Sequence, residues 1–181
     1  MPHIHTQPGH HDLTTSAFII RTDGPEPTVV LHVHRKRPKL FQFGGHVELD
    51  ENPWQALVRE LQEESGYDIA QLTVLQPPGS FRERFSGTAN HPLPFYFNTH
   101  HAENPDHLHY HSDLSHAMLA AGEPAHPIDP RESQAIHRFT AADVRALPTT
   151  DIFDQTRTNA LYILEHLMHH WEAVPASRWP V

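Results

Sequence analysis

The sequence predicts a single domain of the mixed α/β class, an α+β arrangement in which strands are interleaved with a few helices. The chain has 181 residues, enough to bury a substantial core in one domain. Its 38% hydrophobic and 9% aromatic content is typical of a globular protein. Strand-like and helix-like segments alternate without an internal repeat or a domain boundary. We therefore expect residues 1–181 to form one unit.

The chain is expected to begin with a flexible arm followed by a β-hairpin. Residues 1–12 are polar and rich in histidine, which is typical of a poorly ordered start. Segments 13–21 (LTTSAFIIR) and 28–34 (TVVLHVH) are rich in the β-branched and aromatic residues that favour strands. The sequence DGPEP between them is a turn signal. A basic loop over 35–45 then ends in a glycine pair.

A helix is predicted over residues 53–65, PWQALVRELQEES. Asn52 is a suitable N-cap, and Pro53 occupies a first-turn position where proline is tolerated. Gly66 occupies the position after the last helical residue, where glycine commonly ends a helix. The expected helix is about three turns long.

The rest of the chain is predicted to contain four strands and two helices. A short helix is expected over 141–147, and an amphipathic helix over 151–174 with Leu161, Leu164 and Leu167 on one face. The four strands are expected at 72–75, 94–100, 109–119 and 134–140.

Charge and composition exclude several classes of partner. The formal net charge is 13 − 22 = −9, which argues against a nucleic-acid duplex or an anionic membrane as the main partner. The chain has no cysteine, so a disulfide framework or a thiolate metal site cannot form. No apolar run approaches the roughly 18 residues that span a bilayer, and the start lacks the apolar region of a signal peptide. A cytoplasmic location is the resulting expectation.

Three carboxylates crowd one face of the predicted helix. At 100° per residue, Glu60, Glu63 and Glu64 fall within an arc of about 100°, apart from the apolar stripe that can face a core. Arg59 stands one turn before Glu63, where it can pair with a carboxylate. Like charges at this spacing repel unless a cation bridges them, and Mg²⁺ prefers oxygen ligands. The helix face itself leaves two interpretations open, a solvated acidic surface or a metal site.

The residues around this face resemble a known signature. The stretch from Gly45 to Tyr67 is similar to the Nudix box, G-x5-E-x7-R-E-U-x-E-E-x-G-U, where U is a bulky aliphatic residue. Gly45 opens the motif, Glu51 follows after five residues, and Arg59 begins the helical part. Every defined position matches except the last, where Tyr67 replaces an aliphatic residue. Because tyrosine is large and mostly apolar, we expect a variation in packing there.

The resemblance implies a Nudix fold, a mixed β-sheet sandwiched between helices. It also implies hydrolysis of a nucleoside diphosphate linked to another moiety, with Mg²⁺ or Mn²⁺ as the cofactor. In this reading Glu60, Glu63 and Glu64 are the metal ligands. The other box residues position them: Arg59 and Glu51 as orienting partners, Gly45 and Gly66 as the glycines that shape the loops.

The general base is predicted less directly. A carboxylate must accept the proton of the attacking water, and the family uses either a box glutamate or an acidic residue in a later loop. Glu132, just before segment 134–140, is the later candidate, with an exposed loop charge as the alternative.

An alternating polar pattern in segment 109–119 offers a candidate substrate-binding face. His107, His109, His111 and Asp113 fall on one side of a strand. An H-x-H-x-D strand looks like one found in a subset of Nudix proteins. We expect His109, His111 or Asp113 to line the phosphate or metal pocket, while a hydrogen-bonded polar face remains the alternative.

The basic loop offers a second candidate. Arg35 and Arg37, with the lysines beside them, could reach substrate phosphates, while a solvated loop is the alternative.

The sequence therefore predicts a pyrophosphohydrolase. The expected substrate is a small nucleotide-type diphosphate such as a nucleoside triphosphate, an oxidised nucleotide or a nucleotide sugar, and the chain is expected to be a monomer or a homodimer. A Nudix-type sensor that binds without cleaving is the alternative from another class. An isopentenyl diphosphate isomerase-like enzyme ranks behind both, because its chemistry resembles a cysteine-plus-glutamate site and this chain has no cysteine.

Overall fold

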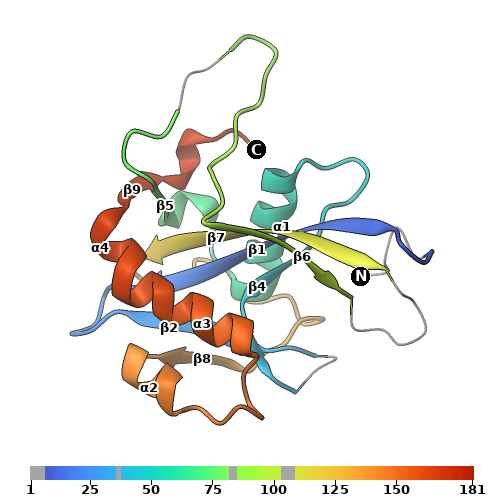
Figure 1. The fold of residues 1–181 in the computed structure, drawn as a ribbon. Coiled ribbons are helices and arrows are strands. Elements are labelled where there is room, and N and C mark those ends of the chain that lie inside the picture. Colours follow the sequence, from blue (N-terminus) through green and yellow to red (C-terminus); the bar gives the residue numbers. More distant parts are fainter. Residues whose placement is uncertain (1–6, 36–37, 82–84, 103–108) are drawn as a thin grey trace.

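The computed structural model describes residues 7–35, 38–81, 85–102 and 109–181. In this part of the chain, nine strands form one mixed sheet with helices on both faces (Figure 1), as predicted. The strands are β1 (His11–Arg21), β2 (Thr28–Val33), β3 (Leu40–Phe41), β4 (Phe43–His46), β5 (Leu72–Gln76), β6 (Tyr96–His101), β7 (Tyr110–Ala120), β8 (Ile136–Phe139) and β9 (Glu172–Pro175). The order is β3-β2-β1-β7-β5-β9, and β4 pairs with β1, β6 with β7, and β8 with β2.

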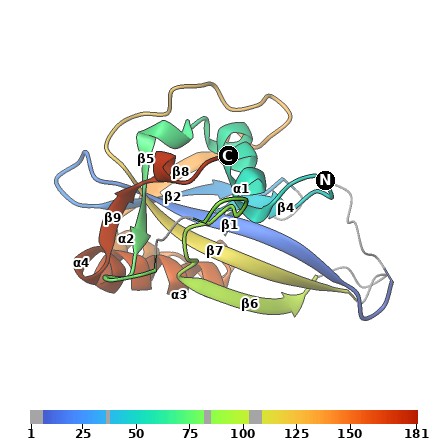
Figure 2. The same ribbon diagram turned by 90° about the horizontal axis from the view of Figure 1, so that it is seen from above.

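The two longest strands form the parallel centre of the sheet. β1 and β7 pair in one unbroken register from His11 opposite Tyr110 to Arg21 opposite Ala120, and lie side by side in Figure 2. β1 begins two residues earlier than predicted, and Asp12 is buried. The predicted arm over 1–12 is therefore wrong at its end, because a residue opposite a β7 partner gains backbone hydrogen bonds that a solvated arm lacks. Residues 1–6 lie outside the described residues.

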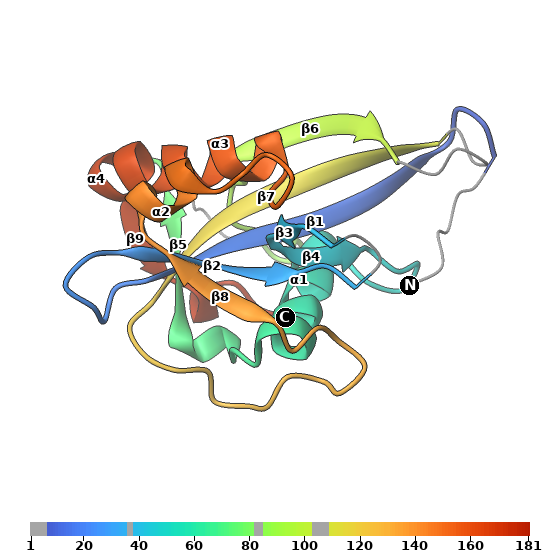
Figure 3. The ribbon, with the colours of Figure 1, turned by 90° about the horizontal axis from the view of Figure 1, so that it is seen from below.

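Alternate side chains of β1 supply two separate cores. Ala17 and Ile19 pack with the helix α1 (Pro53–Ser65) on one face of the sheet. Phe18 and Ile20 pack on the other face, where α2 (Ala141–Ala146), α3 (Asp154–Tyr162) and α4 (Met168–His170) lie. Figure 3 shows these helices on the side of the sheet opposite α1. The strand is apolar on both faces because both are covered.

The helix α1 has the predicted bounds, because its stop signals are local. The Asn52 side chain accepts hydrogen bonds from the N–H groups of Trp54 and Gln55, and the Gln55 side chain accepts one from the Asn52 N–H. This capping box satisfies N–H groups that have no partner within the helix, an arrangement worth about 1 kcal/mol. At the other end Gly66 adopts a φ of 74° and its N–H donates to Gln62.

The predicted helix over 151–174 is wrong at both ends. α3 begins at Asp154, passes through a π-helical turn over Ile163–Leu167, and α4 ends at His170. The next residues form β9, which pairs with β5 and buries Val174. The backbone groups at the edge of β5 need hydrogen-bond partners, which a strand provides and a helix does not. Pro175 lacks an N–H group, so it does not favour extending the helix to this point. None of the helices described is long and apolar enough to cross a membrane.

Candidate active site

The carboxylates of α1 differ in their surroundings. Glu60 and Glu64, one turn apart, are 5% and 7% exposed, whereas the Glu63 side chain is 36% exposed. Glu64 Oε2 accepts a hydrogen bond of 2.8 Å from the Gly44 N–H, so this carboxylate lies against β4. We call Glu60, Glu63 and Glu64 the box cluster. The interpretation of a purely solvated acidic face does not describe this helix, because two of the three side chains are buried.

Gly44 makes that contact possible. It has a φ of 138°, and a Cβ added there would lie 2.2 Å from the Thr15 carbonyl oxygen. β4 therefore runs against β1 too closely for any side chain at this position. The close approach places its N–H beside the buried carboxylate of Glu64.

Arg59 holds the box residues together. Its guanidinium donates to both oxygens of Glu51 at 2.7 and 2.9 Å, and to Glu60 Oε1 at 2.8 Å. A longer contact of 3.4 Å reaches Glu63, and another of 3.3 Å reaches the His46 carbonyl oxygen. The paired hydrogen bonds raise the pKa of Arg59 and lower the pKa of Glu51. Arg59 is thus hydrogen-bonded to Glu51 and Glu60, and its role in catalysis stays a prediction.

Burial dominates the charge state of the two inner carboxylates. It raises the pKa of Glu60, against the pull of Arg59, and raises the pKa of Glu64 well above its ordinary value, against the hydrogen bond from Gly44. Glu63 and Glu132 raise both pKa values further by repulsion. A divalent cation would relieve this repulsion, and a set of carboxylate oxygens fits Mg²⁺ or Mn²⁺.

The loop after β7 brings Glu132 toward this cluster. It crosses the carboxyl end of α1, where the His126 N–H donates to the Gly66 carbonyl at 3.0 Å and the Asp129 N–H to the Glu63 carbonyl at 2.9 Å. Gly66 allows the crossing, because a Cβ there would lie 2.1 Å from the His126 oxygen. Glu132 is partly buried, and its charge acts on Glu60 and Glu64. Its role as the general base stays a prediction.

The last box position keeps a packing role and adds a polar one. Tyr67 is 3% exposed within the core that faces α1. Its hydroxyl accepts a hydrogen bond of 3.0 Å from Arg21 and donates one of 2.9 Å to the Gly122 carbonyl. The tyrosine therefore packs as an aliphatic residue would and also fastens the loop after β7.

A groove of about 730 Å³ runs along the outer side of α1. Arg59, Glu63 and Asp129 line it, whereas Glu60 and Glu64 do not. Its acidic lining would repel phosphate groups unless cations were bound with them.

The predicted substrate-binding residues are divided between several places. Asp113 accepts hydrogen bonds from Thr14 at 2.9 Å, Ser16 at 2.7 Å and Ser115 at 2.6 Å. It lies in register with Thr14, whose side chain alternates with Ala17 and Ile19 and so faces away from α1. This is the hydrogen-bonded polar face that the sequence left as the alternative. Arg35 is exposed beyond β2. Arg37 and His107 lie outside the described residues.

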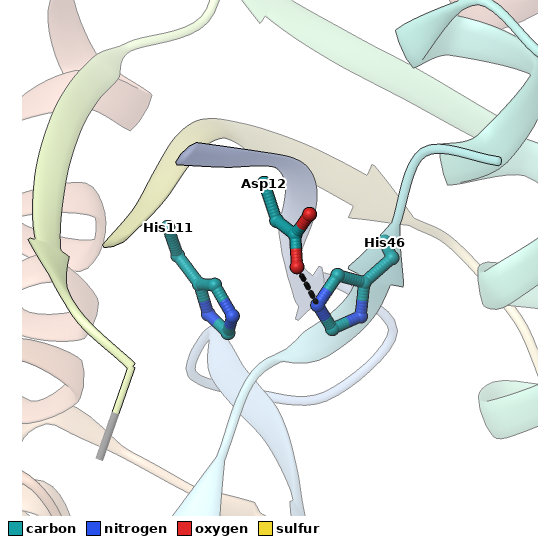
Figure 4. Close-up of side chains that lie close together, drawn as sticks. All are labelled: Asp12, His46 and His111. Atoms are coloured by element: carbon teal, nitrogen blue, oxygen red, sulfur yellow. Dashed lines mark ion pairs between the residues drawn. The ribbon is translucent and has the colours of Figure 1, made fainter. Parts of the chain in front are cut away.

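His111 belongs to a group that the sequence did not predict. Asp12, His46 and His111 place one ligand atom each within 4.8 Å of one another, and Figure 4 shows the three side chains pointing toward one another. We call these residues the histidine cluster. Fully buried His109 lies beside it, with its Nε2 3.6 Å from Asp12 Oδ2. One feature of the sequence could have indicated this group. Asp12 and Thr14 alternate with apolar residues of the first strand, so their side chains share one face of the sheet.

The fold and the site define a class: a mixed sheet with helices on both faces and a loop–helix–loop that carries clustered glutamates. A model of the NUDIX domain matches residues 10–155, and the chain belongs to this family. A Clostridium perfringens hydrolase of the NUDIX family has a similar structure, with a TM-score of 0.65 at 23% identity over 85% of this chain and 96% of that one. The Escherichia coli dihydroneopterin triphosphate pyrophosphohydrolase has a TM-score of 0.59 at 16% identity, over 90% and 99%.

Two curated relatives match in sequence over shorter segments. A Caenorhabditis elegans protein named as a nudix hydrolase is 36% identical over 80 residues, or 41% of this chain and 22% of its own length. The 8-oxo-dGTP diphosphatase of Proteus vulgaris is 59% identical over 32 residues, or 18% of this chain and 29% of its own length. The aligned segments thus span less than a third of either relative.

Proposed function

We propose that this protein is a metal-dependent hydrolase that cleaves the phosphoanhydride of a nucleoside diphosphate linked to another moiety. The observation that carries the proposal is the burial of Glu60 and Glu64 within a nearly complete Nudix box. Two carboxylates with pKa values raised by burial gain most from a bound cation. A purely structural helix would gain nothing from this arrangement.

The cofactor in this proposal is Mg²⁺ or Mn²⁺, held by Glu60, Glu63 and Glu64. All three offer carboxylate oxygens, the donors that these hard ions take. When bound, the ion would neutralise phosphate oxygens and lower the pKa of the attacking water. The acidic lining around Glu63 makes such neutralisation necessary for an anionic substrate.

The protein groups supply orientation and proton transfer in this proposal. Arg59 fixes Glu60 through its Nη1 while both oxygens of Glu51 hold the guanidinium plane. Gly44 fixes the second inner carboxylate, Glu64, through its N–H. We assign Glu132 as the general base that accepts the proton of the attacking water, because its loop is fastened to the end of α1.

The proposed substrates are nucleoside triphosphates, oxidised nucleotides and nucleotide sugars. The likeness to the Proteus vulgaris 8-oxo-dGTP diphosphatase over 32 residues supports including oxidised nucleotides among them. Residues outside the box would select among them, since the box chemistry depends only on the diphosphate.

The test is a substrate panel with Mg²⁺ or Mn²⁺. The purified chain is incubated with nucleoside triphosphates, 8-oxo-dGTP, ADP-ribose, dinucleoside polyphosphates and nucleotide sugars, and products are identified by mass spectrometry. We expect cleavage of one class, lost in the Glu63→Gln/Glu64→Gln variant and kept in Glu26→Gln, a control at an exposed turn carboxylate. Ligand binding without cleavage by the unmodified chain would contradict the proposal and favour the sensor.

A further inference from the structure

The histidine cluster is assembled by strand pairing. Asp12 lies directly opposite His111 in the parallel β1–β7 register, and Thr14 lies opposite His46 in the antiparallel β1–β4 register. Residues in register present their side chains on the same face of a sheet. Asp12, His46 and His111 therefore share one face, and Thr14 alternates with residues that pack against α1. The cluster is on the face opposite the box helix.

The distances in the cluster are close to those of metal ligands. Asp12 Oδ2 lies 3.6 Å from His46 Nε2, and the ligand atoms of all three residues lie within 4.8 Å of one another. Two ligands of a tetrahedral ion with bonds of about 2.0–2.1 Å are about 3.3 Å apart. Small rotations of the two imidazoles would bring all three donors to one ion.

Burial of the Asp12 carboxylate is an electrostatic reason to expect a bound cation. The Asp12 side chain is 1% exposed and the His46 side chain 12% exposed. A buried carboxylate needs compensating positive charge. A divalent ion held beside Asp12 by the two imidazoles would provide this charge.

We propose that Asp12, His46 and His111 form a binding site for a divalent transition-metal ion of the Zn²⁺ type, separate from the box cluster. Two imidazole nitrogens and one carboxylate oxygen suit Zn²⁺, Fe²⁺, Co²⁺ or Ni²⁺, whereas Mg²⁺ prefers oxygen donors alone. Three protein ligands leave a coordination position open for water or an anion.

His109 is the positioning residue of this site. Its Nε2 lies 3.6 Å from the same Asp12 oxygen, its ring centre lies 5.3 Å from that of His111, and it is fully buried. It is outside the group of three whose ligand atoms come together. A partner of this kind orients the carboxylate toward the ion.

The site would also communicate with the box through β4. The His46 carbonyl accepts a hydrogen bond of 3.3 Å from Arg59, and Gly44 donates to Glu64 two residues earlier. An ion bound by the His46 imidazole would fix the strand that positions both box residues.

The test measures metal binding in a chain whose box is disabled, so its result does not depend on hydrolysis. The Glu60→Gln/Glu64→Gln chain, purified without a histidine tag and stripped with EDTA, is titrated with Zn²⁺ by calorimetry. We expect one tightly bound ion, and at least about a 10-fold loss of affinity in Asp12→Asn, His46→Gln and His111→Gln. His109→Gln should lose less than the three ligand variants.

Two controls separate this site from adventitious histidine binding. His137→Gln, at an exposed position of β8, and His3→Ala/His5→Ala should leave the tight binding unchanged. Co²⁺ added to the unmodified chain should give visible absorption bands of low-coordinate nitrogen and oxygen ligation, a readout that needs no variant to fold. Absence of a tight ion and of these bands, or loss of binding only in the control variants, would overturn the proposal.

Discussion

The box cluster and the histidine cluster lie on opposite faces of one sheet and differ in how they are built. Glu60, Glu63 and Glu64 come from one helix and offer only oxygen. Asp12, His46 and His111 come from three strands and offer two nitrogens and an oxygen. Donor type and geometry bias which ion a site selects, so the two proposed sites would differ in the ions that they favour. β4 contacts both clusters, and it is the place where their difference can be tested.

The largest effect should come from the strand that the two clusters share. We expect Gly44→Ala to lower the free energy of unfolding by about 3 kcal/mol, because its Cβ would clash with Thr15 and force β4 outward. Hydrolysis and Zn²⁺ binding should then weaken together. Urea unfolding measures the loss, and Gly122→Ala, where the added Cβ meets nothing within 4 Å, is the control. If only hydrolysis or only Zn²⁺ binding weakened, β4 would not link the two sites.

A substitution within the box cluster should affect hydrolysis without affecting Zn²⁺ binding at the histidine cluster. We expect Glu64→Gln, which removes a proposed metal ligand, to lower kcat/KM by at least about 100-fold, because even the loss of a partner outside the ligand shell costs about 10- to 100-fold. Zn²⁺ binding at the histidine cluster should stay within the error of the titration. Steady-state kinetics and calorimetry on the same preparation measure both. Equal loss of Zn²⁺ binding would mean that the clusters form one site.

The same substitution should stabilise the metal-free protein. The pKa of Glu64 is raised on folding, so its contribution favours the folded state at low pH and is lost as pH rises from about 4.5 through the folded pKa. The Glu64→Gln chain should therefore exceed the unmodified chain in Tm by a margin that grows as pH rises. A buried carboxylate costs about 2 kcal/mol, or about 4–8 °C in a protein of this size.

Thermal scans between pH 5 and 8, with EDTA and with excess Mg²⁺, measure this margin. Mg²⁺ should remove it by stabilising the unmodified chain alone. Burial lowers the pKa of His32 to about 4 and that of His116 to about 3. Both histidines therefore destabilise the unmodified and the Glu64→Gln chain equally below about pH 6.5, so their effect cancels in the difference between the two Tm values. A margin that shrinks with rising pH would contradict the assignment of Glu64.

The smallest effect concerns the one departure from the box motif. Tyr67→Phe keeps the buried ring and removes the hydroxyl that joins Arg21 to Gly122. We expect a loss of about 1 kcal/mol in unfolding free energy, typical of one hydrogen-bonded group. Urea denaturation measures it, with Tyr162→Phe as a control at a half-exposed tyrosine. If Tyr67→Phe and Tyr162→Phe had the same free energy of unfolding, the Tyr67 hydroxyl would not contribute to stability and the residue would act through packing alone.

Local signals explain what the sequence could predict. The bounds of α1 follow from Asn52, Pro53 and Gly66, which act within a few residues of the helix ends. The box gave the family and the grouping of its three glutamates, since a helix places residues three and four apart on one face. Neither inference needed a contact distant in sequence.

Contacts distant in sequence explain what the sequence missed. The short strands β3, β4 and β9 have weak patterns of their own and form because a neighbouring edge is available. The sequence alone places Asp12 in an arm, because its strand partner His111 lies 99 positions away in the chain. The alternation of His109, His111 and Asp113 predicted a shared face but not its partners, which β1 and β4 supply.

The unbroken pairing of β1 with β7 has a consequence for biosynthesis. The first strand of the sheet leaves the ribosome long before residues 110–120, which complete its hydrogen bonding. Until then a chain of more than 100 residues carries an apolar strand, SAFII, with one open edge. Non-local pairings of this kind are slow to form and prone to aggregation while they wait. Nascent chains should therefore depend on chaperones until β7 has emerged, and fragments that end before residue 110 should be insoluble.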